Sequence, residues 1–191
     1  PPPHCEESLP GASYPIWPGN VNLVSLDGQG QAVVEGNLAD GQCSALEWAQ
    51  SGQVACFPST RFNYFEGNQV FYALADPLPP RSEMNITVTP RPGVDVSLYG
   101  YQVGATRYPV PPAVTRTVSC EASYPLGGIF GETNPGEPES LRFANYHETS
   151  SYNIFWAVSG TDTDGETGAF TIEVDVAEEQ THCEESLPGQ Q

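Results

Sequence analysis

The stretch GAFTIEVDVA (residues 168–177) alternates apolar and polar side chains along its length. Successive side chains of a β-strand point to opposite faces of the sheet, so this pattern predicts a strand with one buried and one solvent-exposed face. The apolar residues are Phe170, Ile172, Val174 and Val176, and the polar ones are Thr171, Glu173 and Asp175. The same period of two in MNITVTP (residues 84–90) predicts a second half-buried strand.

Two further stretches are apolar on both faces, NQVFYALAD (residues 68–76) and YNIFWAVSG (residues 152–160). They favour central strands, covered on one face by a partner sheet and on the other by loops. Shorter candidates are QAVVE (31–35), VDVSLYGYQ (94–102), RTVSC (116–120) and SLRFAN (140–145). About eight strands separated by Pro and Gly predict an all-β fold, an antiparallel β-sandwich of the jelly-roll-like kind. CSALEWAQ (residues 43–50) predicts one short helix.

One octapeptide, HCEESLPG, occurs at residues 4–11 and again at residues 182–189, an offset of 178 residues. A repeat with a fixed period is typical of modular proteins, here with a whole domain as the unit. We therefore expect a Pro-rich joint at residues 1–20, a β-sandwich domain at 21–177 and the start of the next joint at 178–191. The expected partners are copies of the chain itself, with an interface that includes His4, Cys5, Glu6, Glu7, His182 and Cys183.

The chain has five cysteines, of which Cys5 and Cys183 occupy the same position in the two copies of the octapeptide. One period therefore contains four: Cys5, Cys43, Cys56 and Cys120. An even number favours disulfides and an oxidising compartment, which predicts an extracellular or cell-surface protein. The sequence has no CxxC pair, which disfavours zinc.

The charge balance excludes two classes of partner. Six Arg and no Lys stand against 24 acidic residues, a net charge of −18. Such a surface repels the phosphates of nucleic acids and anionic lipid headgroups. No apolar run approaches the length of about 20 residues that spans a bilayer, so we expect no membrane insertion.

No catalytic motif is present, since the sequence lacks GxSxG, HExxH and a phosphate-binding Gly-rich loop. Of three histidines, two belong to the octapeptide copies. The third, His147, lies beside Glu148 in a loop between predicted strands, where a solvated turn is favoured over a catalytic pair. We expect that the protein is not an enzyme.

The order of VFYALAD, NITVTP, VDVSLYGYQ, ESLRFAN, YNIFWAVSG and GAFTIEVDV resembles the bacterial pre-peptidase C-terminal domain family over residues 67–177. The resemblance implies a compact, non-catalytic, jelly-roll-like β-sandwich of secreted bacterial proteins, some of which bind calcium or, in collagenases, collagen. Residues 37–65 depart from the family and have the character of an insertion, which contains Cys43 and Cys56.

Two disulfide pairings are expected on this basis. Cys43 and Cys56 would close a short loop that staples the insertion and its helix. Cys5 would bond Cys120 within its own domain, because the fold of the family starts with the N-terminal segment, while Cys183 bonds the Cys120 equivalent of the next domain. The competing arrangement bonds Cys183 to Cys120 of the same domain.

Calcium is the one cofactor left open. Asp162, Asp164 and Glu166 cluster in GTDTDGETG, and clustered carboxylates with a glycine can wrap calcium. An EF-hand would need acidic residues where Gly160 and Thr171 stand, so a solvated hairpin turn is favoured. Glu6 and Glu7 are the second candidate pair, since some calcium-binding relatives draw ligands from this segment.

Tyr99 and Tyr101 point to the same face of their predicted strand and allow two interpretations. As exposed side chains they would stack on sugar rings or dock a neighbouring domain. As buried ones they would pack beneath the long loop at residues 102–117.

Together these patterns predict a non-catalytic structural repeat module of an extracellular bacterial filament, stalk or adhesin. The alternative is an accessory domain of a secreted hydrolase that binds carbohydrate or protein.

Overall fold

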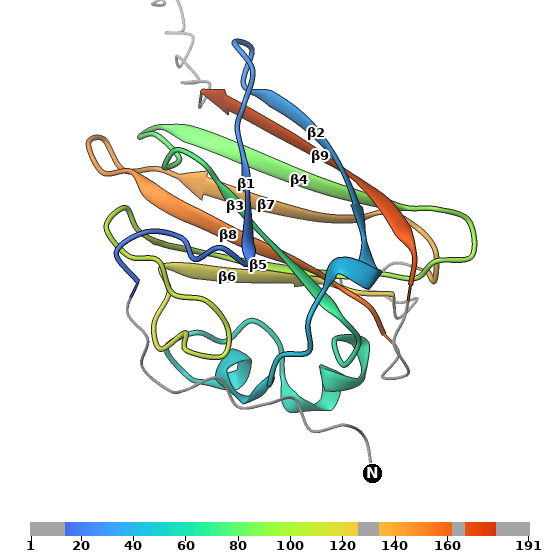
Figure 1. The fold of residues 1–191 in the computed structure, drawn as a ribbon. Coiled ribbons are helices and arrows are strands. Elements are labelled where there is room, and N and C mark those ends of the chain that lie inside the picture. Colours follow the sequence, from blue (N-terminus) through green and yellow to red (C-terminus); the bar gives the residue numbers. More distant parts are fainter. Residues whose placement is uncertain (1–13, 126–133, 162–166, 179–191) are drawn as a thin grey trace, which may run out of the picture.

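A computed structural model describes residues 14–125, 134–161 and 167–178 of the chain. This part folds into two stacked β-sheets, with their strands labelled in Figure 1. The strands are β1 (Val21–Val24), β2 (Gln31–Asn37), β3 (Gln69–Leu74), β4 (Ser82–Pro90), β5 (Ser97–Gly104), β6 (Ser119–Ser123), β7 (Glu139–Asn145), β8 (Tyr152–Ser159) and β9 (Ala169–Glu178). No helix in these ranges is long and apolar enough to cross a membrane.

The five-stranded sheet, here sheet A, has the order β1-β3-β8-β5-β6, and the four-stranded sheet B has the order β2-β9-β4-β7. All paired neighbours are antiparallel except β1 and β3, which run parallel. The predicted all-β antiparallel sandwich is therefore confirmed, and every stretch that the sequence pattern marked as a strand contributes to one.

Strand β1 was not among the predicted strands. It has four residues, VNLV, and it pairs with β3 from Val21 opposite Phe71 to Val24 opposite Leu74. Leu23 in its middle is 58% exposed. So short a segment has no periodicity to detect, and it becomes a strand because the edge of β3 offers its backbone hydrogen-bonding partners.

The inner faces of the two sheets form one hydrophobic core. Sheet B contributes alternate residues of its central strands, such as Ile86 in β4 and Ile172 in β9, and both are fully buried. The intervening residues of these strands, such as Asn85 and Glu173, are exposed. The period of two in the sequence thus marks the sheet that has one face in solvent.

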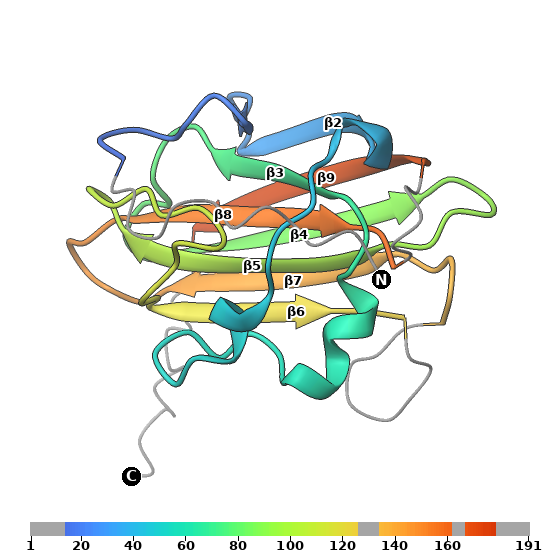
Figure 2. The ribbon, with the colours of Figure 1, turned by 60° about the horizontal axis from the view of Figure 1, so that its bottom comes forward.

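Sheet A is covered on both faces. Every residue of β3 is buried, as are nearly all residues of β5 and β8. Its outer face carries a third layer, which Figure 2 shows as loops and short helical turns in front of the sheet. These turns are 3-10 helices: η1 (Leu38–Asp40), η2 (Glu47–Gln50) and η3 (Ser59–Tyr64). The predicted short helix at residues 43–50 is thus a single turn at its C-terminal half.

Candidate functional site

Residues 38–65, here called the cover segment, form most of the third layer. Its buried side chains, which include Trp48, Phe57 and Phe65, form a second hydrophobic cluster with the outer face of sheet A. Phe57 stacks on Phe65 with ring centroids 4.1 Å apart, and Trp48 lies 5.4 Å from the ring of Tyr99. Aromatic side chains bury large apolar areas, so this layer is a second core and is part of the folded domain.

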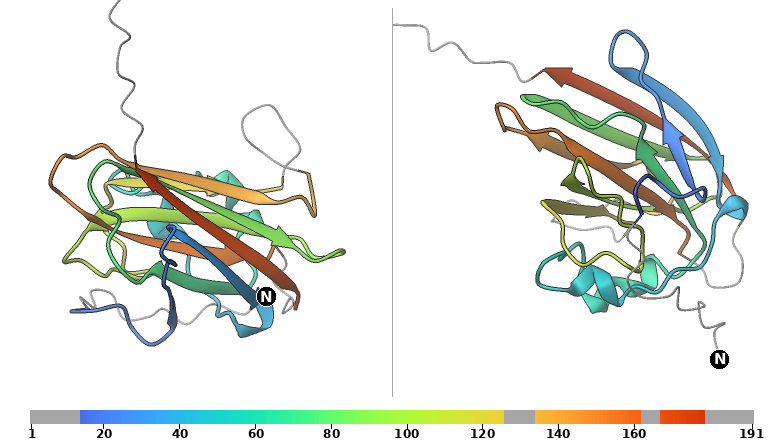
Figure 3. Two further views of the ribbon diagram at one scale, coloured as in Figure 1. Left: turned by 90° about the horizontal axis from the view of Figure 1, so that it is seen from above. Right: turned by 60° about the vertical axis from the view of Figure 1, so that its left-hand side comes forward.

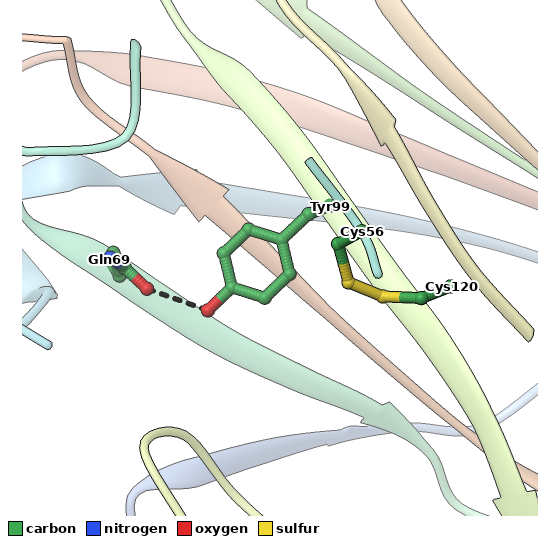
Figure 4. Close-up of a disulfide and its surroundings, with 4 residues drawn as sticks. All are labelled: Cys56, Gln69, Tyr99 and Cys120. Atoms are coloured by element: carbon green, nitrogen blue, oxygen red, sulfur yellow. Dashed lines mark hydrogen bonds between the residues drawn. A yellow bond between two sulfur atoms is a disulfide. The ribbon is translucent and has the colours of Figure 1, made fainter. Parts of the chain in front are cut away.

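A disulfide between Cys56 and Cys120 ties the cover segment to sheet A, with the two Cα atoms 4.8 Å apart. Cys120 lies in β6 opposite Tyr101 of β5, and side chains of paired residues share a face of the sheet. Cys120 therefore points to the outer face, where the cover segment brings Cys56 to it (Figure 4).

This bond corrects both expected pairings. Cys43 does not bond Cys56, and Cys120 bonds neither Cys5 nor Cys183, because Cys56 and Cys120 are partners. The expectation of a disulfide-stapled insertion is right, but the staple spans 64 residues and joins the insertion to a strand. Cys43 also belongs to a disulfide, whose partner lies outside the described residues.

Tyr99 and Tyr101 are fully buried beneath the third layer. The Tyr101 hydroxyl donates a hydrogen bond to the carbonyl oxygen of Pro109 at 2.7 Å, and Val110 and Val114 belong to the same cluster. The interpretation of these tyrosines as an exposed interface is therefore wrong, and the alternative, packing beneath the loop at residues 102–117, is correct for Tyr101. Burial raises the pKa of both phenols well above the ordinary value.

Most other predicted site residues lie outside the described residues. They are the octapeptide residues His4, Cys5, Glu6, Glu7, His182 and Cys183, and the acidic turn Asp162, Asp164 and Glu166. Within the described ranges no group of three or more His, Cys, Asp and Glu side chains is placed to hold a metal ion.

His147 and Glu148 lie in an exposed turn between β7 and β8. The carboxylate of Glu148 forms an ion pair with Arg81 at 2.6 Å. The imidazole of His147 instead meets the ring of Tyr152 edge to face, with centroids 6.0 Å apart. The geometry agrees with the solvated turn that the sequence favoured.

The sandwich has a groove along the edge where β6 of sheet A meets β7 of sheet B. Two adjoining hollows of about 550 Å³ and 360 Å³ share Gln102, Val118, Ala144 and Tyr146 in their walls. Val118 is 55% exposed and Tyr146 is 64% exposed. Between the two sheets, the side-chain amide of Gln102 donates a hydrogen bond to the carbonyl oxygen of Ala144 in sheet B at 3.2 Å.

The charged rim of this groove includes Arg142, whose guanidinium forms an ion pair with Glu83 on β4. The pKa of Arg142 is raised, chiefly by the hydrogen bonds that its guanidinium donates to Glu83 and then by the charge of that carboxylate. Sequence reasoning did not identify this groove. Val118, Arg142 and Tyr146 are scattered in sequence, and only the order of the strands places them along one edge.

Comparisons with known proteins leave the family open. No family model matches the chain, and no curated protein matches it. The pre-peptidase C-terminal domain of collagenase from Bacillus anthracis is similar in structure, with a TM-score of 0.39 and 12% identity over 84% of this chain and 97% of that one. The periplasmic g-type lysozyme inhibitor PliG from Aeromonas hydrophila has a TM-score of 0.34 and 10% identity over 83% and 98%.

A third structure is CorA, a surface-associated copper-binding protein important in copper acquisition by Methylomicrobium album BG8 (TM-score 0.39, 12% identity, 83% of this chain and 98% of that one). The first of the three belongs to the family that the strand order resembles. Membership of that family stays a prediction, and the fold rests on the strand pairing itself.

Proposed function

We propose that this chain is a non-catalytic structural module of an extracellular bacterial filament, stalk or adhesin, in which copies are joined at the octapeptide. The single observation that carries the proposal is the identical recurrence of HCEESLPG after 178 residues. An identical stretch of eight residues that includes Cys, Pro and Gly serves the same role twice when two equivalent joints flank one domain.

The positions of the two described ends support a linear assembly. Near the N-terminal end, Trp17 packs on the outer face of sheet A, with its ring 5.9 Å from that of Phe155. At the C-terminal end, the chain leaves sheet B at Glu178, the last residue of β9. In Figure 1 this end of β9 lies on the opposite side of the molecule from the cover segment. A module whose chain enters and leaves on different sides extends a polymer with each copy.

The disulfide supports an extracellular or envelope location. Cys56 and Cys120 are bonded, and such bonds persist in oxidising compartments. A disulfide cross-link within each module also suits a protein that is under mechanical tension.

Immunoelectron microscopy of the source cells tests the proposal. Gold-labelled antibodies against the domain should mark filaments or stalks at a regular axial spacing. Labelling that is confined to single secreted particles would contradict it.

The groove between β6 and β7 favours a second candidate, an accessory module that binds carbohydrate or protein. Tyr146 offers an exposed aromatic ring beside Val118, and aromatic rings of this kind stack on sugars or partner side chains. Tyr146→Ala should abolish retention of the chain on insoluble polysaccharide or collagen if this groove is the binding site. Tyr14→Ala, at an exposed tyrosine outside the groove, is the matched control.

A further inference from the structure

We infer that Cys43 is the acceptor for the octapeptide cysteine: it bonds Cys5 of its own module, while Cys183 bonds the Cys43 equivalent of the module that follows. The bond between Cys183 and the next module rests on the proposed function, whereas the bond between Cys5 and Cys43 does not depend on it. The inference replaces Cys120 by Cys43 as the anchor of the joint.

Two cysteines of the sequence are candidates for the partner of Cys43. Cys43 belongs to a disulfide, and Cys56 and Cys120 are bonded to each other. The sequence has two further cysteines, Cys5 and Cys183. Both stand in the same octapeptide, so their local chemistry is identical and only their distance from Cys43 distinguishes them.

Cys183 is too far along the chain to reach Cys43 of the same module. The chain approaches Cys43 at the end of the sandwich where β9 begins, since the Leu38 amide donates to the Gly168 carbonyl oxygen at 2.9 Å. β9 then runs for ten residues, about 30 Å at 3.3 Å per residue, away from that end. Figures 1 and 3 show the end of β9 and the cover segment on opposite sides of the molecule.

Cys183 follows Glu178 by only five residues. An extended chain covers at most about 3.6 Å per residue, so these residues reach about 18 Å. That span is shorter than β9 alone. A bond from Cys183 back to Cys43 of the same module would require the end of β9 to unpair from β2 and β4.

The described chain begins near the cover segment, and the sequence before it is long enough for Cys5 to reach Cys43. Trp17 lies on the outer face of sheet A, in the same cluster as Leu46 and Trp48 of the cover segment. Tyr14, where the described chain begins, lies nine positions after Cys5, and a chain of this length reaches about 32 Å. The face to be crossed is about 23 Å long, measured along the eight residues of β8 at about 3.3 Å per residue.

In a tandem array with these bonds, every cysteine of an internal module is part of a disulfide. Each period contains one octapeptide cysteine, one Cys43, and the Cys56–Cys120 pair. Each new bond removes two protons and two electrons from two thiols. The acceptor is a disulfide oxidant such as oxidised glutathione, which is reduced to two molecules of glutathione.

The test is disulfide mapping of the full chain after oxidative folding with oxidised and reduced glutathione and alkylation with N-ethylmaleimide. We expect a peptide in which Cys5 is bonded to Cys43, and a single alkylated thiol at Cys183. Cys5→Ser should expose Cys43 to alkylation, and Cys183→Ser should abolish alkylation and leave the other bonds intact. A bond between Cys43 and Cys183 within one chain, or a free Cys43 in the unaltered chain, would overturn the inference.

A chain with two consecutive copies of residues 4–181 and a final octapeptide tests the bond between Cys183 and the Cys43 equivalent of the following module. Cys183 should then be protected, and replacing the second copy of Cys43 by Ser should make Cys183 reactive. Protection of Cys183 that survives this substitution would overturn the inter-module bond. If the expected disulfides are found but microscopy shows no polymer, the proposed filament is contradicted and the bond between Cys5 and Cys43 is not.

Discussion

The hydroxyl of Tyr99 donates a hydrogen bond to the side-chain oxygen of Gln69 at 2.6 Å, and both residues are buried between sheet A and the cover segment (Figure 4). The amide nitrogen of Gln69 donates in turn to the carbonyl oxygen of Phe65 at 3.1 Å. These two bonds link β5 and β3, two strands of sheet A that are separated by β8, with Phe65 of the cover segment above them.

Tyr99→Phe should lower the free energy of unfolding by about 1–3 kcal/mol, because it leaves the buried oxygen of Gln69 without a donor. Urea denaturation measures the change. Tyr146→Phe, at a side chain that is 64% exposed, should change stability by less than about 0.5 kcal/mol. Equal effects of the two substitutions would contradict the role of the buried bond.

Stability should fall steeply at alkaline pH. The pKa values of Tyr99 and Tyr101 are raised well above 10.0 by burial, so the folded chain keeps both protons while the unfolded chain loses them. Their contribution is fully present below pH 10 and is lost as the pH rises, by up to about 1.4 kcal/mol per pH unit for each phenol. Urea midpoints at pH 9, 10 and 11 measure this slope. Tyr101→Phe should make it shallower, and an unchanged slope would count against the prediction.

Replacing Cys56 and Cys120 together by Ser should lower the free energy of unfolding by about 4 kcal/mol, since the bond closes a loop of 64 residues in the unfolded chain. Thermal and urea unfolding of the double variant, compared with the oxidised parent, measure the loss. A loss below about 1 kcal/mol would show that the cover segment needs no covalent tie to β6.

Trp17→Ala should lower stability by about 3–5 kcal/mol, because the indole is buried against Tyr108 and Phe155. Ile16→Ala is the matched control, since its side chain is 69% exposed. If both substitutions are neutral in urea denaturation, the N-terminal segment is not anchored on sheet A, and the route proposed for Cys5 loses its support.

The periodicity of the sequence was a reliable guide to the strands and their faces. In β9, Phe170 and Ile172 are buried and Glu173 is exposed, as the alternation predicted. In β5 the pattern also placed Tyr99 and Tyr101 correctly on one face. It did not reveal whether that face meets solvent, because a tyrosine suits a buried and an exposed position equally well.

The sequence by itself determined an all-β sandwich, since side-chain alternation is a local property of each strand and survives in any arrangement of the strands. Only the tertiary structure decided which strands are neighbours, and with them the Cys56–Cys120 bond and the groove at Tyr146. Disulfide partners are set by the few ångströms between two sulfur atoms in the folded chain. Cys56 is closer in sequence to Cys43, but packing of the cover segment on β6 brings it to Cys120.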